Sequence, residues 1–556
     1  MTRDVRIGTC LWLAIAVGGA AAQGDRRLKV YDIDDIAAPS SSGVAVPAVT
    51  PLAAALALNY GEAAEAEESL DIDVDRVMTI VQLVLGESAE ISLERGKLWV
   101  NGGSSDHDAV AAALTALRDA FAERVFLRIG VFDAAPEKTI LGAAEADALF
   151  ASRTPRAVAS ASTRVDRPTE IRAGVDAAFV ADYDVEVAQE SEIADPLVRR
   201  LRLGLTASVT ACSMPDGRFL VRAGGVYASP AQGSESAIPV GSRAVGDMQA
   251  AAVDFGAVCG SGVVENGGAV VLGADATGAA WVVQATRAKA PSERRGWKFA
   301  GFGALLRAPG RLLPAPLGGA HESSQNGKEV GATEIGPTPV DSDVLLSLLR
   351  RTAWPEDQPE GEDLEMVGPR LFARGGDAFL ERIRSAAAAV ASDLVRPASI
   401  EVRYGRLTPA DAAKAVAASD ASRLPGRLCV SARSGETFRI TAGTERARVV
   451  DHDVEIAQKA RIADPVTRPV FSGVSFEGSL SLGGDGVPAV AGRFSARQET
   501  SRTFHVRTEE VGPLQLAQVA TTDLGGEVSL PKGGWRLFGS ASDAEGVFVV
   551  MMRAAE

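Results

Sequence analysis

Carboxylates at alternating positions occur twice in this chain and are the side chains best suited to chemistry. They are Asp182, Asp184 and Glu186, and further along Asp451, Asp453 and Glu455. Because successive side chains of a strand point to opposite faces, each set would lie on one face of a strand. Such hard oxygen ligands suit Ca²⁺, and paired carboxylates can also serve a hydrolase. A solvated face that discourages edge pairing explains them equally well. We adopt this last interpretation and assign no metal, cofactor or catalytic site.

Imidazole and thiol chemistry would need residues that the sequence keeps apart. The four histidines fall at a predicted helix start, in a linker, in a strand and in a loop: His107, His321, His452 and His505. A metal cluster or a Cys/His dyad requires such groups to converge. Apart from Cys10, the chain has three cysteines. Cys212 and Cys259 could form a disulfide, but we favour buried thiols for both and for Cys429.

The first carboxylate set belongs to a segment that occurs twice. Val180–Pro196 reads VADYDVEVAQESEIADP, and Val449–Pro465 reads VVDHDVEIAQKARIADP at a constant offset of 269. Eleven of the seventeen positions are identical without a gap. The chain therefore contains an internal duplication.

The elements around the repeat follow one order in the first half. Apolar residues at helical spacing follow Asp71, and a hairpin spans Glu90–Val100. Ser105 and Asp108 suit a capping box for the next helix, and Val125–Val131 alternates as a strand. From about residue 155 to 285 the pattern is almost wholly β, with turns at Pro215–Gly217 and Asn266–Gly267.

The second half repeats this order. Leu364–Gly376 overlays Ile91–Gly103 without a gap, and Gly533–Gly539 matches Gly267–Gly273. We therefore predict an α+β fold of two tandem modules, each a small two-layer α+β domain followed by a mainly β domain. The expected boundaries are 1–22 for a signal peptide, 23–60 for a strand and loop, 61–133 and 134–288 for the first module, 289–338 for a linker, and 339–405 and 406–556 for the second module.

The start of the chain and its charge restrict location and partners. Arg3 and Arg6 precede the apolar run Ile7–Val17 and then Ala20–Ala22, the order of a secretory signal peptide. No later run is long enough for a membrane-spanning helix. The net charge of −15 disfavours nucleic acid, which rewards clustered Lys and Arg. We expect an exported protein, periplasmic or associated with the cell envelope.

The order of motifs resembles the secretin family of type II and type III secretion-system outer-membrane proteins. LKVYDIDDI is similar to the strand that opens many of these chains, and Leu93–Phe121 to the ring-building N-domains, with Leu114–Arg118 as the Leu-x-x-Leu-Arg pattern. The segments IADPLVRRLRLGLTASVTA, around Gly204, and VENGGAVVLG are similar to two signatures of the secretin homology domain. We find no pair of long alternating strands with an apolar outer face.

The resemblance implies the fold family and an exported location, and because no catalytic constellation stands out we predict a non-enzymatic structural protein that needs no cofactor. Its partners would be proteins, through self-association or an envelope complex such as a secretion apparatus. The alternative is a monomeric binding module for carbohydrate, peptide or Ca²⁺. If the two modules fold autonomously, a fragment ending near residue 288 should unfold cooperatively by itself.

Overall fold

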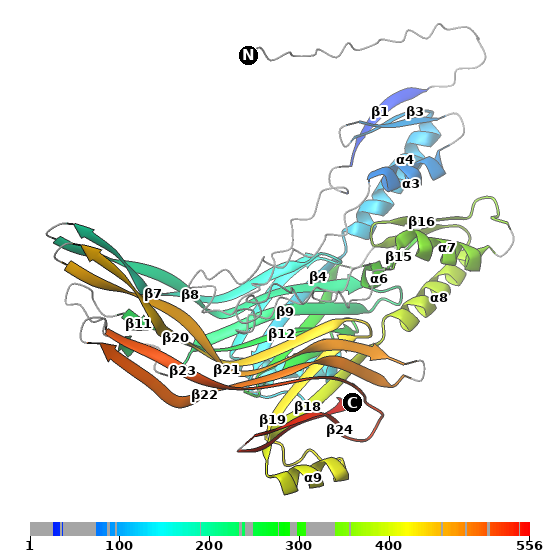
Figure 1. Ribbon diagram of the computed structural model, residues 1–556. Helices are drawn as coiled ribbons and strands as arrows, with labels where there is room; N and C mark the ends of the chain where they lie inside the picture. Colours follow the sequence, from blue (N-terminus) through cyan, green and yellow to red (C-terminus); the bar gives the residue numbers. More distant parts are fainter. Residues whose placement is uncertain are drawn as a thin grey trace, which may run out of the picture.

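The computed structural model describes the chain in sixteen stretches, which form two small α+β domains beside two large antiparallel sheets (Figure 1). They are residues 26–33, 36, 74–85, 89–94, 97–188, 191–232, 236–238, 248–275, 277–289, 297–306, 340–354, 357–457, 460–483, 486–508, 512–543 and 545–555. The protein is thus a mixed, β-rich fold.

The first small domain places two helices against a three-stranded sheet of order β1-β3-β2. Its elements are β1 (Arg27–Asp32), α3 (Val74–Val84), β2 (Glu90–Glu94), β3 (Lys97–Gly102) and α4 (Ser104–Phe121). Both helices contribute apolar residues at helical spacing to one core, among them Val77, Ile80 and Leu114. The strand expected within residues 23–60 is β1, and after it Ile33 and Ile36 insert into this core.

The start of α4 differs from the expected capping box. The helix begins at Ser104, so that Ser105 lies within it. The carboxylate that closes the first turn is Asp106, which accepts the Gly103 N–H at 2.9 Å, and not Asp108. Asp106 lies two residues nearer the helix start than Asp108, so its carboxylate reaches the backbone N–H groups that have no acceptor within the helix.

The second small domain has the same plan, with sheet order β15-β17-β16. Its elements are β15 (Trp297–Gly301), α6 (Gly303–Leu306), α7 (Ser342–Ala353), β16 (Asp363–Val367), β17 (Arg370–Arg374) and α8 (Asp377–Leu394). The linker expected over 289–338 is therefore too long. Residues 297–306 belong to this domain, because β15 pairs with β17 as β1 pairs with β3.

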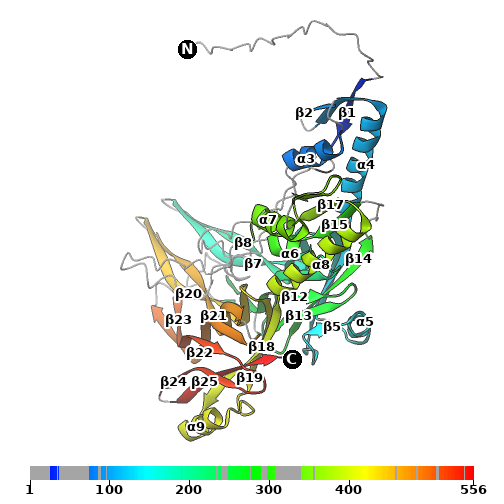
Figure 2. The same cartoon turned by 90° about the vertical axis from the view of Figure 1, so that its right-hand side faces the viewer.

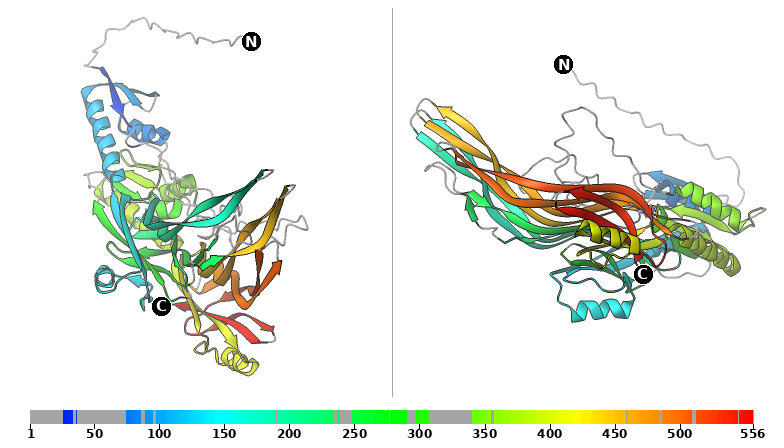
Figure 3. Two further views of the ribbon diagram at one scale, coloured as in Figure 1. Left: turned by 90° about the vertical axis from the view of Figure 1, so that its left-hand side faces the viewer. Right: turned by 60° about the horizontal axis from the view of Figure 1, so that its bottom comes forward.

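Four strands from each half form one eight-stranded sheet. Its order is β23 (Gly512–Ser529), β22 (Pro488–Thr508), β21 (Ala460–Leu482), β20 (Thr437–Ala457), β12 (Ala252–Val264), β9 (Phe219–Pro230), β8 (Ser191–Ser213) and β7 (Thr169–Ala188). Several of these strands exceed 20 residues and extend away from the small domains (Figure 3). The sequence did not indicate strands of this length, because frequent Ala, Gly and Arg interrupt the apolar alternation.

A nine-stranded sheet lies against the first. Its order is β24 (Arg536–Asp543), β25 (Gly546–Ala555), β18 (Pro397–Leu407), β19 (Gly426–Arg433), β13 (Ala269–Ala274), β14 (Ala280–Lys289), β4 (Arg124–Phe132) and β6 (Ala157–Arg164), with β5 (Ile140–Leu141) beside β13. A short hairpin, β10 (Ser236–Ile238) and β11 (Met248–Ala250), completes the strands described.

Two helices in the predicted β regions cover the outside of the nine-stranded sheet (Figure 2). Helix α5 (Ala143–Ser152) packs Leu149 and Phe150 on the first half, and α9 (Pro409–Ala418) packs Ala412 on the second. A signal for α9 was present: Thr408 caps it, Pro409 occupies the first turn and Asp411 follows.

One hydrophobic core lies between the two large sheets and contains residues of both halves. Val258 and Trp281 from the first half are buried with Phe438, Ile440 and Phe476 from the second. The two β regions are therefore not separate folding units, because removing either half would expose the apolar surface of the other.

Candidate association surface

The two halves of the chain are joined by hydrogen-bonded strands, which we call the internal seam. Strand β12 pairs antiparallel with β20 from Ala252↔Arg446 to Cys259↔Arg439. Strand β13 pairs with β19 at Gly273↔Val430 and Ala274↔Cys429. Both large sheets therefore run without interruption from the first half into the second.

Glycine permits the close approach of strands at the internal seam. A Cβ atom on Gly273 would lie 2.8 Å from the carbonyl oxygen of Cys429, and one on Gly260 would lie 2.6 Å from that of Ser431. Both distances are shorter than a side chain tolerates. Gly273 is the last residue of the GGAVVLG pattern.

A buried polar cluster crosses the internal seam. Glu436, in the turn before β20, pairs with Arg222 of β9 at 3.1 Å between Oε1 and Nε, and it accepts a hydrogen bond from the Ser261 hydroxyl. The Ser261 oxygen in turn accepts the Arg433 backbone N–H at 3.0 Å. Glu436 is 3% exposed and Arg222 9%. Charges this deeply buried are tolerated when they are paired and hydrogen-bonded.

The small domains also contact each other. Helix α3 of the first covers the outer face of the second domain's sheet, where Phe372 and Val367 join the apolar core of α3. Arg76 of α3 pairs with Glu365 at 2.8 Å and with Asp343 at 2.6 Å. The corresponding outer face of the first domain carries Trp99 and is partly exposed.

A second buried cluster ties the second small domain to the first-half sheets. Arg370 of β17 pairs with Glu123 at 2.9 Å and with Asp166 at 3.3 Å. Asp166 also accepts the Ser213 N–H at 2.7 Å and its hydroxyl at 2.8 Å. Burial raises the pKa of Asp166, and the Arg370 guanidinium opposes that shift.

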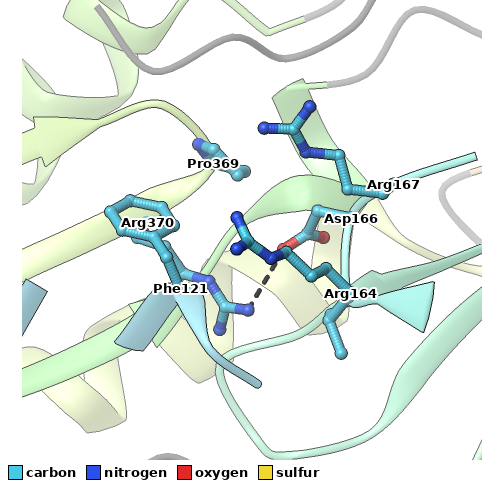
Figure 4. A pocket seen from close by; sticks show the side chains of 7 residues that line it. Phe121, Arg164, Asp166, Arg167, Pro369 and Arg370 are labelled. Atoms are coloured by element: carbon cyan, nitrogen blue, oxygen red, sulfur yellow. Dashed lines mark ion pairs between the residues drawn. The ribbon is translucent and has the colours of Figure 1, made fainter. Parts of the chain in front are cut away.

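A cavity of about 20 Å³ lies beside this cluster, lined among others by Phe121, Pro369 and Arg370 (Figure 4). That volume holds about one water molecule. It is too small for a carbohydrate or peptide ligand. The cluster of Arg370, Glu123 and Asp166 is therefore a structural contact.

Each large sheet ends in two strands with one unpaired side within the part of the chain that the structure describes. These open edges are β7 and β23 in the eight-stranded sheet, and β6 and β24 in the nine-stranded sheet. Large apolar side chains are exposed there, including Val175 of β7 (66%), Val158 of β6 (42%) and Leu537 of β24 (39%). An open edge with exposed apolar residues is a template for pairing with another strand.

The carboxylates singled out in the sequence lie on the long strands. Asp184 pairs with Asp195 and Asp453 with Asp464, and a bulge precedes each set at the same place, Val180/Asp182 and Val449/Asp451. The side chains of Asp182, Asp184, Glu186, Asp453 and Glu455 lie outside the described residues, and Asp451 is exposed. Where side chains are described, no group of three or more His, Cys, Asp or Glu residues could hold a metal ion.

Histidine and cysteine have structural settings where they are described. His107 contacts the Tyr31 hydroxyl at 3.1 Å through Nδ1, and its Nε2 lies 2.8 Å from the Arg27 carbonyl oxygen, which ties β1 to α4. His321 and the side chains of His452 and His505 lie outside the described residues. Cys212, Cys259 and Cys429 are thiols and form no disulfide. Burial raises the pKa of the Cys429 thiol to about 11, so it is a poor nucleophile.

The sequence did not identify the internal seam as a functional surface. The only sign of it in the sequence was indirect, namely the internal duplication. Corresponding residues are 269 positions apart along β7 and β20 and 266 positions apart along β13 and β24. No helix in the described stretches is long and apolar enough to span a membrane.

No protein-family model and no curated protein matches the sequence. Among solved structures, the chain is similar to the Salmonella SPI-1 type III secretion injectisome secretin InvG, with 12% identity over 39% of this chain and 78% of that one, at a TM-score of 0.19.

Two further structures show the same level of similarity. The V. cholerae type IV competence pilus secretin PilQ matches with 10% identity over 48% of this chain and 78% of that one, at a TM-score of 0.21. Aeromonas hydrophila ExeD matches with 8% identity over 86% of this chain and 87% of that one, at a TM-score of 0.19. TM-scores of this size do not define a common fold.

Proposed function

We propose that this chain is an exported, non-enzymatic structural protein of the cell envelope, built by tandem duplication, that associates with protein partners by extending its sheets. The observation that carries the proposal is the internal seam, where two halves of the chain already join through paired strands. Strands β7, β23, β6 and β24 each have an unpaired side, at which another strand could pair as the two halves do at the internal seam.

The chemistry of the described residues supports a structural role. The buried charges of Arg370, Glu123, Asp166 and Glu436 are engaged in pairing between elements. The 20 Å³ cavity beside Arg370 has no room for a substrate. The motif resemblance to secretins agrees with this role and with a place in an envelope assembly.

Light scattering on a sizing column would test the proposal. We expect the chain without residues 1–22 to elute as a discrete multimer, with and without mild detergent. Val175→Lys puts a charge on the β7 edge and should shift the protein toward monomer, because charged side chains on an edge strand oppose pairing with another strand. Ile140→Lys is the matched control, since Ile140 is 38% exposed but lies on β5, away from the open edges. A wild-type monomer at all accessible concentrations would refute the proposal.

A further inference from the structure

We propose that the partner at the open edges is a second copy of this chain, bound head to tail. The end of the second half would meet the start of the first half of the next chain. This inference rests on the proposed function and specifies its partner and strand register. Such a heterologous contact repeats from chain to chain, giving a ring if the rotation closes and a filament if it does not.

Corresponding strands can be identified on both sides of the internal seam. Strand β7 corresponds to β20 at an offset of 269, because the same bulge interrupts both. Strand β23 corresponds to β12 at an offset of 266. The pairing of β23 with β22 corresponds in register to the pairing of β12 with β9. The open edge of β23 is therefore the counterpart of the β12 edge that β20 occupies.

Transfer of the internal register predicts the register between chains. The pair Ala252↔Arg446 becomes Gln518 opposite Ala177 of the next chain, and Cys259↔Arg439 becomes Gly525 opposite Glu170. In the nine-stranded sheet the same transfer places the β24 edge beside β6 of the next chain, as β13 lies beside β19.

Side chains at the transferred register are complementary. Leu524, partly buried against the shared core, falls opposite Ile171, which is 4% exposed in that core. The corresponding internal pair, Val258 and Ile440, is likewise apolar.

The neighbouring positions at this register carry opposite charges. Asp523 and Arg172 are both exposed and fall directly opposite each other. Opposite charges directly across two strands stabilise their pairing.

The polar position of the seam is complementary as well. Glu436 corresponds to Arg167, and Ser261 corresponds to Glu527. Across the chain boundary an Arg would thus face a Glu, where Glu436 faces Ser261 within the chain. Between chains the carboxylate would lie on the other strand of the pair, but it would again face a hydrogen-bond donor.

The small domains offer the same kind of match. Within a chain, α3 covers the outer face of the β15-β17-β16 sheet. The uncovered counterpart on the first domain exposes three apolar side chains: Leu28 (62%), Val30 (41%) and Trp99 (38%). The counterpart of α3 is α7, whose outer side exposes Val344 (65%) and Leu348 (49%). We place α7 of one chain on the β1-β3-β2 sheet of the next.

A charge exchange tests the register in the chain without residues 1–22. Arg172→Asp or Asp523→Arg alone should raise the dissociation constant between chains by about tenfold or more, because like charges then face each other. The double variant should restore association. Arg172 and Asp523 also pair with Glu170 and Arg493 within the chain. Restoration in the double variant is a result that a folding defect in either single variant would not give.

Disulfide trapping provides a second, independent measurement. Val175→Cys with Ala520→Cys places thiols directly opposite at the transferred register, and oxidation should give a ladder of linked chains. Val175→Cys with Thr522→Cys is the control displaced by two residues and should link poorly.

The outcomes separate the two proposals. Restoration by the double variant and a ladder from the 175/520 pair would support the head-to-tail register. A multimer that links only through the displaced pair, or that the double variant fails to restore, would overturn the register while leaving a self-associating structural protein. A monomer by light scattering would overturn both.

Discussion

The outer face of the small sheet is built twice in this chain and is covered once. In the second small domain Phe372 is fully buried beneath α3, whereas Trp99, at the corresponding position of the first, is 38% exposed. Both residues are large and aromatic, and both lie in the middle strand of a three-stranded sheet. Residue type does not explain the difference.

Position along the chain explains it. The second domain follows another domain that can cover it, and the first follows none among the described residues. The same holds for the buried cation of the middle strand: Arg370 is 5% exposed between Glu123 and Asp166, while its counterpart Lys97 pairs with Asp32 on the surface. Paired substitutions at corresponding positions therefore measure what the neighbouring half contributes.

Deleting the second half should have the largest effect, because it uncovers the core as well as one sheet face. A fragment of residues 23–288 keeps β12 and Trp281 but loses the strands that cover them. We expect it to aggregate or to melt without a cooperative transition, as followed by circular dichroism and sedimentation. A soluble fragment with a sharp two-state transition would show that the shared core is dispensable.

Arg370→Ala should lower the free energy of unfolding by about 3–5 kcal/mol, since it leaves Glu123 and Asp166 buried with less compensation. Lys97→Ala, at the corresponding exposed position, should cost about 1 kcal/mol or less. Urea denaturation of the two variants measures the contrast. Equal losses would mean that burial of the cluster is not what makes Arg370 important.

Phe372→Ala should cost about 3–4 kcal/mol of unfolding free energy, because it opens a cavity between the two small domains. Trp99→Ala should change the stability of the single chain by about 1 kcal/mol or less and should weaken association between chains instead. Thermal melts at low concentration and light scattering at high concentration separate the effects. A stability loss at Trp99 as large as that at Phe372 would contradict the comparison.

A smaller effect than at Arg370 or Phe372 is expected at Glu401, which has no acidic counterpart in the first half. Burial raises its pKa, but Arg553 and Arg427, at 2.6 and 2.7 Å, outweigh burial, so the folded-state pKa lies below its ordinary value of 4.5. The stability it contributes is therefore present above that value and is lost as the pH falls through the lowered folded-state pKa.

Glu401→Gln should cost about 1–2 kcal/mol at pH 7, discounted because its arginine partners are partly exposed, and less at pH 3. Urea titrations at the two pH values test this. Arg128→Gln, at the corresponding position of the first half, is the control and should show no such loss of effect at pH 3. An effect of Glu401→Gln that is independent of pH would exclude the ion pairs as its cause.

Local patterns predicted the small domains well and the large sheets poorly. Helical spacing identified α3, and the repeated order of the second half implied α7 and α8. The turn glycines identified the hairpins around Gly217 and Gly267, which take positive φ. These features depend on neighbours within a few residues. The pairing of β12 with β20 depends on residues far apart in the chain, and no local pattern specifies it.

The open edges of the large sheets could not be predicted from the sequence for a related reason. Val175 and Leu537 have ordinary strand sequences, and only the sheet order shows that they lie at open edges. The alternating carboxylates drew attention because their types suit chemistry. Among the described residues, buried ion pairs instead involve Glu436 and Arg370, and neither residue belongs to a recognisable sequence motif.

The internal seam also determines when the protein can complete its fold during synthesis. Strand β12 ends at Val264, but its partner β20 begins only at Thr437, after the whole second small domain has been made. Contacts so distant in sequence form late, since closing the intervening loop costs entropy before pairing compensates for it. The emerging chain must therefore carry an uncovered β12 edge until β20 has been synthesised, and a helper that shields such edges would raise the yield of native protein.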